Sequence, residues 1–242
     1  MLVWRPLAAS ESDALGNRVL LRGDHTRALE WFDRSLRLEP AWPLLYEDRG
    51  RALATSDPAA AIVEFTRADC GAPCDAQIGD AFVRLGKPAD AIDHYLRARA
   101  VGRVSAMALE LVQAKKVDDA VALERALIAR LHDGFLERAD VASAYATLGT
   151  IQADAASFQP RDATLRRRQA ALAFAAAVQR APFNEGYLLS YASALAQEGE
   201  TTAARQTYDR VLTLHPGEPH AQAALAALGG EGARSGGATP SP

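Results

Sequence analysis

The sequence predicts an all-α solenoid of about six helix–turn–helix repeats with a short capping helix at its C-terminal end. The main evidence is a recurrence of equivalent residues 34 positions apart along the 242 residues. This spacing separates matching residues in the pairs Gly16 and Gly50, Pro6 and Pro40, Pro182 and Pro216, and Phe174 and Tyr208. Alanine, the best helix former, makes up about a fifth of the chain, and alternating β-branched runs are rare.

The first repeat shows why each element is expected. Gly16 lacks a Cβ atom, so a second helix can approach the first one closely at this position. Gly23-Asp24 ends the first helix and turns the chain, as a glycine just beyond a helix does. Ala28 and Phe32 lie four residues apart on one face of the second helix, and Pro40 ends the repeat because proline cannot continue a helix.

The order of small residue, turn, alanine and aromatic residue returns in the later repeats. The expected repeats are residues 9–42, 43–71, 72–101, 102–134, 135–183 and 184–217, followed by the capping helix over 218–228. In the fourth repeat, Glu124 occupies the position of the aromatic residue. The third and fourth repeats are short, whereas the fifth has nine extra residues between its small residue and its alanine. We expect this insertion to form a loop around Ala155–Pro160.

The pattern resembles the tetratricopeptide repeat family, in which an alanine precedes an aromatic residue by four positions and a proline closes the repeat. The alanine–aromatic pairs are Ala28 and Phe32, Ala61 and Phe65, Ala91 and Tyr95, Ala170 and Phe174, and Ala204 and Tyr208. The resemblance covers residues 9 to 216. It implies a right-handed solenoid whose first helices line a concave groove, and a protein-interaction scaffold that binds a partner peptide or helix there.

The family's groove-facing positions can be transferred repeat by repeat. They are Asp13, Asn17, Leu20, Glu47, Arg51, Asp80, Arg84, Gln113, Asp154, Ser193 and Gln197, with Thr150 and Leu189 beside them. The best-known members of the family clamp a partner's C-terminal carboxylate with lysine and asparagine. Only Asn17 matches that scheme, while Asp13 and Glu47 would repel a carboxylate. We therefore do not expect a receptor for acidic C-terminal tails.

Composition and motifs narrow the functional classes. The net charge of −3 argues against nucleic acid as a partner. No apolar run is long enough to span a membrane. The sequence contains no phosphate loop, metal-ligand set or nucleophile–base motif, so we expect no cofactor, no metal and no catalytic residue. Residues 1–8 are expected to form an N-terminal stub that could be the end of a longer segment, and residues 229–242 a disordered tail.

Two local motifs leave alternatives open. Cys70 and Cys74 form a C-x3-C pair at the turn between two repeats, which fits small structural residues, a local disulfide in an oxidising compartment or, least well, a metal site. Arg166-Arg167-Arg168 opens the second helix of the fifth repeat. Consecutive helical residues point around the helix, so this run indicates a solvated face, or else a contact with phosphate or an acidic partner.

We therefore predict a non-catalytic scaffold for an unidentified protein or peptide partner, located in the cytoplasm. A first alternative is an extracytoplasmic appendage of a bacterial membrane or glycan-assembly protein of the O-antigen ligase or polymerase kind. An alternative from another class is an enzyme or regulatory subunit that uses the insertion in the fifth repeat. Self-association through the apolar face of Ala170–Val178 or through the stub is a further hypothesis.

Overall fold

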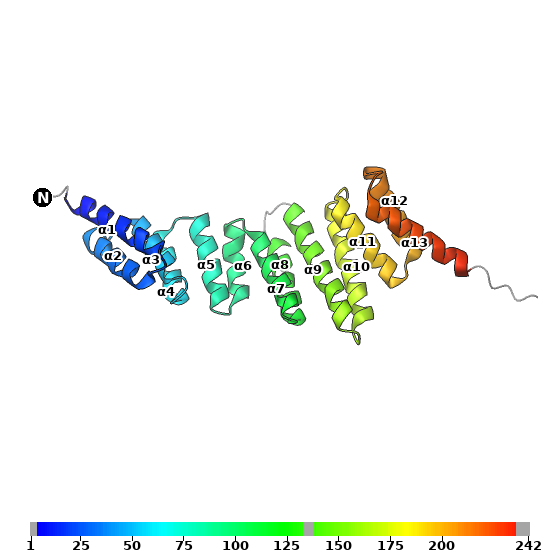
Figure 1. Cartoon of the computed structure of the whole chain (residues 1–242), viewed down its shortest axis with the longest axis horizontal. Helices are drawn as coiled ribbons and strands as arrows, with labels where there is room; N and C mark the ends of the chain where they lie inside the picture. The colour runs from blue at the N-terminus through cyan, green and yellow to red at the C-terminus, as the bar shows by residue number, and fades with distance from the viewer. Residues whose placement is uncertain (1–3, 133–137, 236–242) are drawn as a thin grey trace, which may run out of the picture. The chain divides into compact units, whose positions relative to one another are not determined.

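The computed structural model describes residues 4–132 and 138–235, and over these ranges the chain is all α, without a β-strand (Figure 1). The helices are α1 (Trp4–Leu20), α2 (His25–Leu38), α3 (Pro43–Leu53), α4 (Pro58–Ala68), α5 (Ala72–Arg84), α6 (Pro88–Arg97), α7 (Val101–Gln113), α8 (Val117–His132), α9 (Arg138–Phe158), α10 (Ala163–Arg180), α11 (Glu185–Glu198), α12 (Thr201–Leu214) and α13 (Pro219–Ser235). The predicted fold class is thus confirmed.

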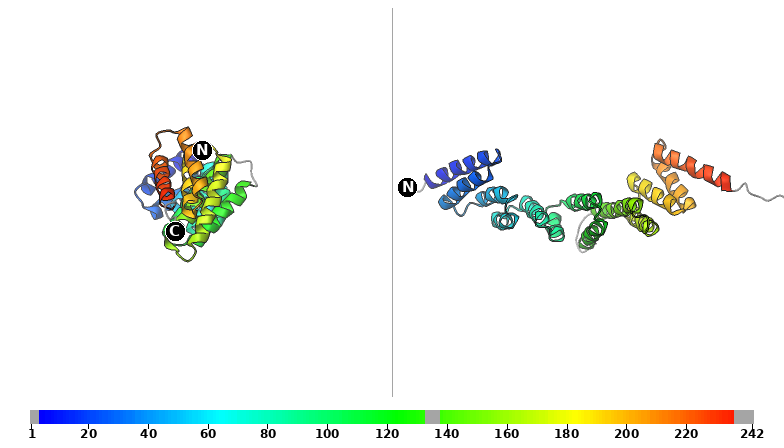
Figure 2. Two further views of the ribbon diagram at one scale, coloured as in Figure 1. Left: turned by 90° about the vertical axis from the view of Figure 1, so that its right-hand side faces the viewer. Right: turned by 60° about the horizontal axis from the view of Figure 1, so that its bottom comes forward.

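The chain divides into two compact bodies, which we describe separately. The N-terminal body covers residues 1–104 and contains the hairpins α1–α2, α3–α4 and α5–α6. The C-terminal body covers residues 105–242 and contains α8 together with the hairpins α9–α10 and α11–α12 and the final helix α13. Within each body the second helix of one hairpin packs against the first helix of the next (Figure 2).

Sequence signals at the helix ends explain where the hairpins turn. Asp24 and Asp57 cap α2 and α4 by accepting hydrogen bonds from the backbone N–H groups of Arg27 and Ala60, at 3.1 and 3.0 Å. Gly199 follows α11 with a φ of 85°, which an L side chain rarely adopts. These caps satisfy backbone groups that lack partners inside the helix.

One contact between the two helices recurs through the hairpins. A Cβ atom placed on Gly16, Gly50, Gly79 or Gly149 would lie only 2.6–2.8 Å from a ring carbon of Phe32, Phe65, Tyr95 or Phe174, respectively. These rings are buried at the places where the alanine–aromatic pattern predicts them. In α11 and α12 the equivalent pair is Ala192 and Tyr208, which share one buried cluster.

The insertion in the fifth repeat forms helix rather than a loop, so that prediction is wrong. The helix α9 continues to Phe158, with Ala155 and Ala156 buried, and α10 begins seven residues before Ala170. In α2, α4, α6 and α12 the corresponding alanine lies three residues after the first helical residue. The extra residues therefore add about one turn to each helix. Alanine-rich sequence favours helix, and apolar contacts across the longer hairpin stabilise it.

The described helices also extend beyond both expected ends of the array. The helix α1 begins at Trp4, inside the expected stub, because Pro6 lies in the first turn, where a missing N–H group costs little. The helix α13 ends at Ser235 rather than at 228, since Gly229 does not adopt a positive φ. The rest of the expected tail, residues 236–242, lies outside the described residues, as does the segment 133–137 at the border of the fourth and fifth repeats.

The fourth hairpin differs from the others in its core. Glu124 in α8 is completely buried at the position where the other hairpins carry an aromatic ring, and Ala108 in α7 is completely buried at the position of their small residue. The Ser105 hydroxyl donates a hydrogen bond to Glu124 Oε1 at 2.9 Å, whereas Glu124 Oε2 is buried without a partner. Burial raises the pKa of Glu124 to about 7, although the Ser105 hydrogen bond lowers it.

We expect Gly79→Ala to lower the unfolding free energy by about 1–3 kcal/mol, because the added Cβ would overlap the buried Tyr95 ring. The matched control is Gly102→Ala in α7, where a Cβ meets nothing within 4 Å. Since alanine is the better helix former, that control should be neutral or stabilising by up to about 1 kcal/mol. Urea unfolding followed by circular dichroism measures both, and equal midpoints for the two variants would contradict this account of the contact.

Glu124→Gln should remove a pH dependence from the stability. The folded pKa lies above the unfolded value, so the folded state binds the extra proton and loses stability as pH rises from about 4.5 to about 7. Above pH 7, the amide variant should be more stable than the wild type by about 3 kcal/mol, and near pH 4.5 the two should agree. Glu110→Gln, at an exposed position on α7, is the control. Parallel pH profiles for wild type and Glu124→Gln would refute the assignment.

Candidate functional site

The C-terminal body contains an open cavity of about 480 Å³ along α9 and α11, which are the first helices of its two hairpins. It is lined by Thr150 and Ala153 of α9, Phe174 of α10, Leu189, Ser190, Ser193, Ala194 and Gln197 of α11, Tyr208 of α12 and His220 of α13. The structure therefore brings together Thr150, Leu189, Ser193 and Gln197, which the sequence placed in the groove.

Helical periodicity explains why these side chains reach the cavity. On α11, Leu188, Ala192 and Leu195 face the buried core, where they pack with Tyr208 and Val211 of α12. Positions 189 and 193 directly follow two of these core residues, and together with 197 they form an adjacent stripe four residues apart. The core contact thus fixes which stripe of α11 is presented to the cavity.

The cavity is polar at its rim but carries little charge. Asp, Glu, Lys and Arg are absent from its described lining, and its polar groups are hydroxyls, the Gln197 amide and the His220 ring. Burial raises the pKa of Tyr208, Ser193 lowers it through a hydrogen bond, and the charge of Glu218 raises it. The Tyr208 phenol therefore stays neutral near pH 7 and offers a hydrogen bond, beside an apolar floor of Ala153, Leu189 and Ala194.

Beside the cavity, Glu218 fixes the beginning of α13. Its carboxylate accepts a hydrogen bond from the backbone N–H of Ala221 and lies 2.8 Å from His220 Nδ1. Burial raises the pKa of Glu218, but the hydrogen bonds from Ala221 and His220 together lower it by more than burial raises it. The pKa of Glu218 therefore lies below its usual value. The ionised carboxylate complements the positive helix terminus and holds His220 at the rim.

In the N-terminal body, the predicted groove residues Asp13, Asn17 and Arg51 form hydrogen bonds with one another or with Asp48. Asn17 Nδ2 donates to Asp48 Oδ2 at 2.9 Å and to Asp13 Oδ2 at 3.4 Å, and Arg51 Nη1 donates to Asp48 Oδ1 at 2.9 Å. Burial and the neighbouring Asp48 raise the pKa of Asp13 to about 6. These atoms link α1 to α3, so Asn17 is already engaged and is not free to clamp a carboxylate.

Two further predicted residues of this body also serve intrachain contacts. Asp80 accepts hydrogen bonds from the Tyr95 hydroxyl at 2.8 Å and from Arg103 Nη1 at 2.6 Å. Arg84 Nη1 donates to the Ala54 carbonyl at 3.3 Å. These contacts leave fewer polar groups to a partner than the sequence suggests.

The remaining predicted residues lie at scattered places. Leu20 packs against the buried cluster that contains Phe32. Glu47 is half-buried on α3, while Gln113 and Asp154 are exposed on α7 and α9. None of these four residues lines the cavity.

The sequence interpretation missed several members of both sites. Asp48 stands one residue after the predicted Glu47, and a shift of one residue turns a helical side chain by about 100°. Tyr208 was assigned to the core, which is correct for its ring but overlooks its hydroxyl. His220 belongs to the capping helix, to which the repeat pattern assigns no partner-binding role.

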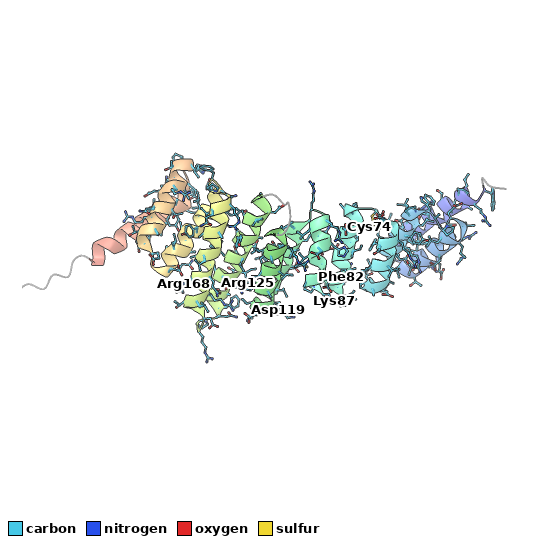
Figure 3. All side chains as sticks on the ribbon, turned by 180° about the vertical axis from the view of Figure 1, so that it is seen from behind. Cys74, Phe82, Lys87, Asp119, Arg125 and Arg168 are labelled. Carbon is cyan, nitrogen blue, oxygen red and sulfur yellow. A yellow bond between two sulfur atoms is a disulfide. The ribbon has the colours of Figure 1, made fainter. Side chains whose placement is uncertain are left out.

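The structure shows the geometry of the cysteine pair and of the arginine run. Cys70 and Cys74 are joined by a disulfide across the turn between α4 and α5, and Cys74 is buried (Figure 3). Arg166 turns inward rather than into solvent, donating to Gln152 Oε1 at 3.0 Å and to Asp118 Oδ1 at 2.9 Å, while Arg167 and Arg168 are exposed.

Among the described residues, no cluster of three acidic, histidine or cysteine side chains is arranged to hold a metal ion. None of the helices in those ranges has both the length and the hydrophobicity of a membrane-spanning segment.

The fold and these surfaces define a helical-repeat protein. Residues 185–228, which form α11, α12 and the first part of α13, match the family model of the tetratricopeptide repeat. A glycine packed on an aromatic ring recurs outside the matched residues, in the hairpins α1–α2, α3–α4, α5–α6 and α9–α10, so the fold is that of an all-α helical-repeat array. A search of curated proteins found no match.

Solved structures of similar fold have low sequence identity to the chain. The Cut9–Hcn1 tetramer of the APC/C is 14% identical with a TM-score of 0.47, over 92% of this chain and 43% of that one. The TPR2AB domain of yeast Sti1 in complex with pHSP90 is 16% identical with a TM-score of 0.39, over 91% and 96% of the two chains. Pseudomonas aeruginosa PilF is 17% identical with a TM-score of 0.38, over 97% and 95%. The chain therefore spans less than half of the Cut9–Hcn1 chain.

Proposed function

We propose that this protein is a non-catalytic scaffold that binds an uncharged, extended segment of a partner protein in the cavity between α9 and α11. The observation that carries the proposal is the cavity itself, which combines an apolar floor with a neutral hydrogen-bonding rim. Its volume of about 480 Å³ falls within the range of roughly 300–1,000 Å³ that is typical of ligand sites. The cavity is open along α9 and α11, so an extended peptide segment can pass through it.

The chemistry of the lining restricts the partner segment. Apolar side chains would contact Ala153, Leu189 and Ala194, while backbone or amide groups would bond to Ser193 and Gln197. A charged side chain would lose its hydration here without gaining an ionic partner, which is unfavourable. We therefore expect selectivity for neutral segments.

The feature that suggested an enzyme or a regulatory subunit is not present in the structure. That alternative depended on a long loop in the fifth repeat, and that insertion instead lengthens α9 and α10. The cavity has hydroxyls and one imidazole, but His220 is 85% exposed at its side chain and is paired with Glu218. General base catalysis needs a base held against the hydroxyl that it activates. Binding requires no such arrangement.

A disulfide favours an oxidising compartment over the cytoplasm, in which thiols are kept reduced. The Cys70–Cys74 bridge therefore supports the extracytoplasmic alternative for the location of this protein. The association with membrane or glycan-assembly proteins stays a prediction from the sequence.

The groove can be tested with a random peptide-display library selected on the full chain. Thr150→Arg combined with Gln197→Arg should weaken the selected peptides by about tenfold or more, because two cations would enter a neutral rim. Gln179→Arg combined with Thr202→Arg adds the same charge at exposed positions outside the cavity and is the control. Fluorescence anisotropy measures the affinities. Equal affinities for both double variants, or enrichment of strongly charged peptides, would overturn the proposal.

The disulfide predicts the thiol content of the native protein. Protein isolated from its source cells after thiol blocking, then denatured without a reductant, should show no free thiol, and reduction should release two. Mass spectrometry of the blocked protein makes the count. Two blocked cysteines before reduction would place the protein in a reducing compartment and would contradict the proposed location.

A further inference from the structure

A second, smaller cavity lies in the C-terminal body on a different face of α9. Its volume is about 210 Å³, and it is lined by Arg125 of α8, Tyr145, Leu148 and Gln152 of α9, and Gln169, Leu172 and Ala173 of α10. The residues of α9 that line it are distinct from Thr150 and Ala153, which face the first cavity. It is too small for a typical small-molecule site, and suits a side chain of a docked protein.

The surface around this cavity is apolar and basic at once. Leu172 lines the cavity although it is 64% exposed, and Leu165, one heptad earlier on the same face, is 57% exposed. Arg168 lies between these two leucines on α10, and Arg125 of α8 lines the cavity together with Leu172. Both arginines are exposed, and they are labelled near the same edge of the body in Figure 3. An exposed apolar patch bordered by polar residues marks an interaction site, and arginine is enriched at protein interfaces.

The positive charge of this surface is poorly neutralised within the chain. Arg125 and Arg168 make no ion pair with any residue in the described ranges. Within the described ranges Arg166 forms an ion pair with Asp118, whose side chain is 90% exposed, and the Nε atom of Arg166 is buried without a partner there. Arg180 lies over the Tyr145 ring, 4.4 Å from its centroid, and adds a fourth guanidinium. Ion pairs with such an exposed carboxylate contribute little.

We propose that this surface, formed by Arg125, Leu165, Arg168 and Leu172 around the smaller cavity, docks a partner-protein segment that combines carboxylates with an apolar side chain. The apolar side chain enters the cavity against Leu148, Leu172 and Ala173, and the carboxylates pair with Arg125 and Arg168. This surface is separate from the larger cavity between α9 and α11, and the proposal does not depend on the function proposed for that cavity.

Charge and shape favour a protein over a nucleic acid here. The chain as a whole carries a net charge of −3, and Asp118 forms an ion pair with Arg166 beside this surface, which weakens a field for a polyphosphate backbone. Single-stranded nucleic acids bind through free aromatic faces. The aromatic ring at this cavity, Tyr145, is covered by Arg180.

The test selects a random peptide-display library on the wild-type chain and compares the enriched peptides on three variants. Arg125→Glu with Arg168→Glu reverses the two unpaired charges, and Leu172→Ser removes the apolar contact. Arg22→Glu with Arg205→Glu changes the net charge equally at exposed positions elsewhere. Circular dichroism unfolding should be similar for all of them, since every changed side chain is exposed.

The expected peptides combine Asp or Glu with Leu, Ile or Phe, and bind about tenfold or more weakly to the charge-reversed variant and to Leu172→Ser. Their affinity should fall with salt and should be unchanged by the control variant and by Thr150→Arg with Gln197→Arg. Failure to enrich peptides that depend on Arg125 and Arg168 would overturn the proposal. It would also be overturned by a single-stranded oligonucleotide that binds this surface when acidic peptides do not, or by wild-type self-association in ultracentrifugation that the charge reversal abolishes.

Discussion

The architecture depends on one steric constraint, the close approach of an aromatic ring on the second helix to a residue without a Cβ atom on the first. The contact occurs in four hairpins, from Gly16 with Phe32 to Gly149 with Phe174. A methyl group at any of these glycines would displace a buried ring, so each pair sets the spacing of its two helices. The hairpin α7–α8 departs from this rule, and its buried Glu124 introduces a titratable group where the others have only packing.

Because the ring contact uses one stripe of the first helix, it also decides which stripe faces outward. In α11 the core stripe contains Ala192 and the outward stripe contains Ser193. The corresponding outward stripes of the N-terminal body behave differently, since Asn17 binds Asp48 and Asp80 binds Arg103. Equivalent positions in one repeat family thus stabilise neighbouring helices in one body and line an open cavity in the other.

The sequence could predict the features that depend on local spacing. The recurrence of 34 residues predicted the hairpins and the buried rings. The positions transferred from the family include Ser193 and Gln197, which line the same cavity in the structure. The sequence could not show which polar side chains bind one another. Asn17 binds Asp48 and Asp80 binds Arg103, and in each pair the second residue comes from the following repeat, so the contact depends on the spacing of the helices. The insertion was misjudged for a related reason: length alone does not distinguish a loop from a helix whose added residues pack against a partner helix.

In the structure, the insertion in the fifth repeat contributes residues to the basic and apolar surface. The added turn at the beginning of α10 contains Leu165 and Arg166, and the added turn of α9 lies opposite it. A hairpin of ordinary length would end before these residues, so Arg166 would not reach Gln152 and Asp118, and the apolar and basic stripe would begin only at Arg168. Lengthening a hairpin is a conservative way to add binding surface, since it keeps the glycine–aromatic contact and the caps of neighbouring repeats unchanged. The C-terminal body thereby presents a neutral groove on one face of α9 and a basic, apolar surface on another. A scaffold with two faces of different chemistry can bind two segments at once, and joining them in one partner would raise the overall affinity without any new contact.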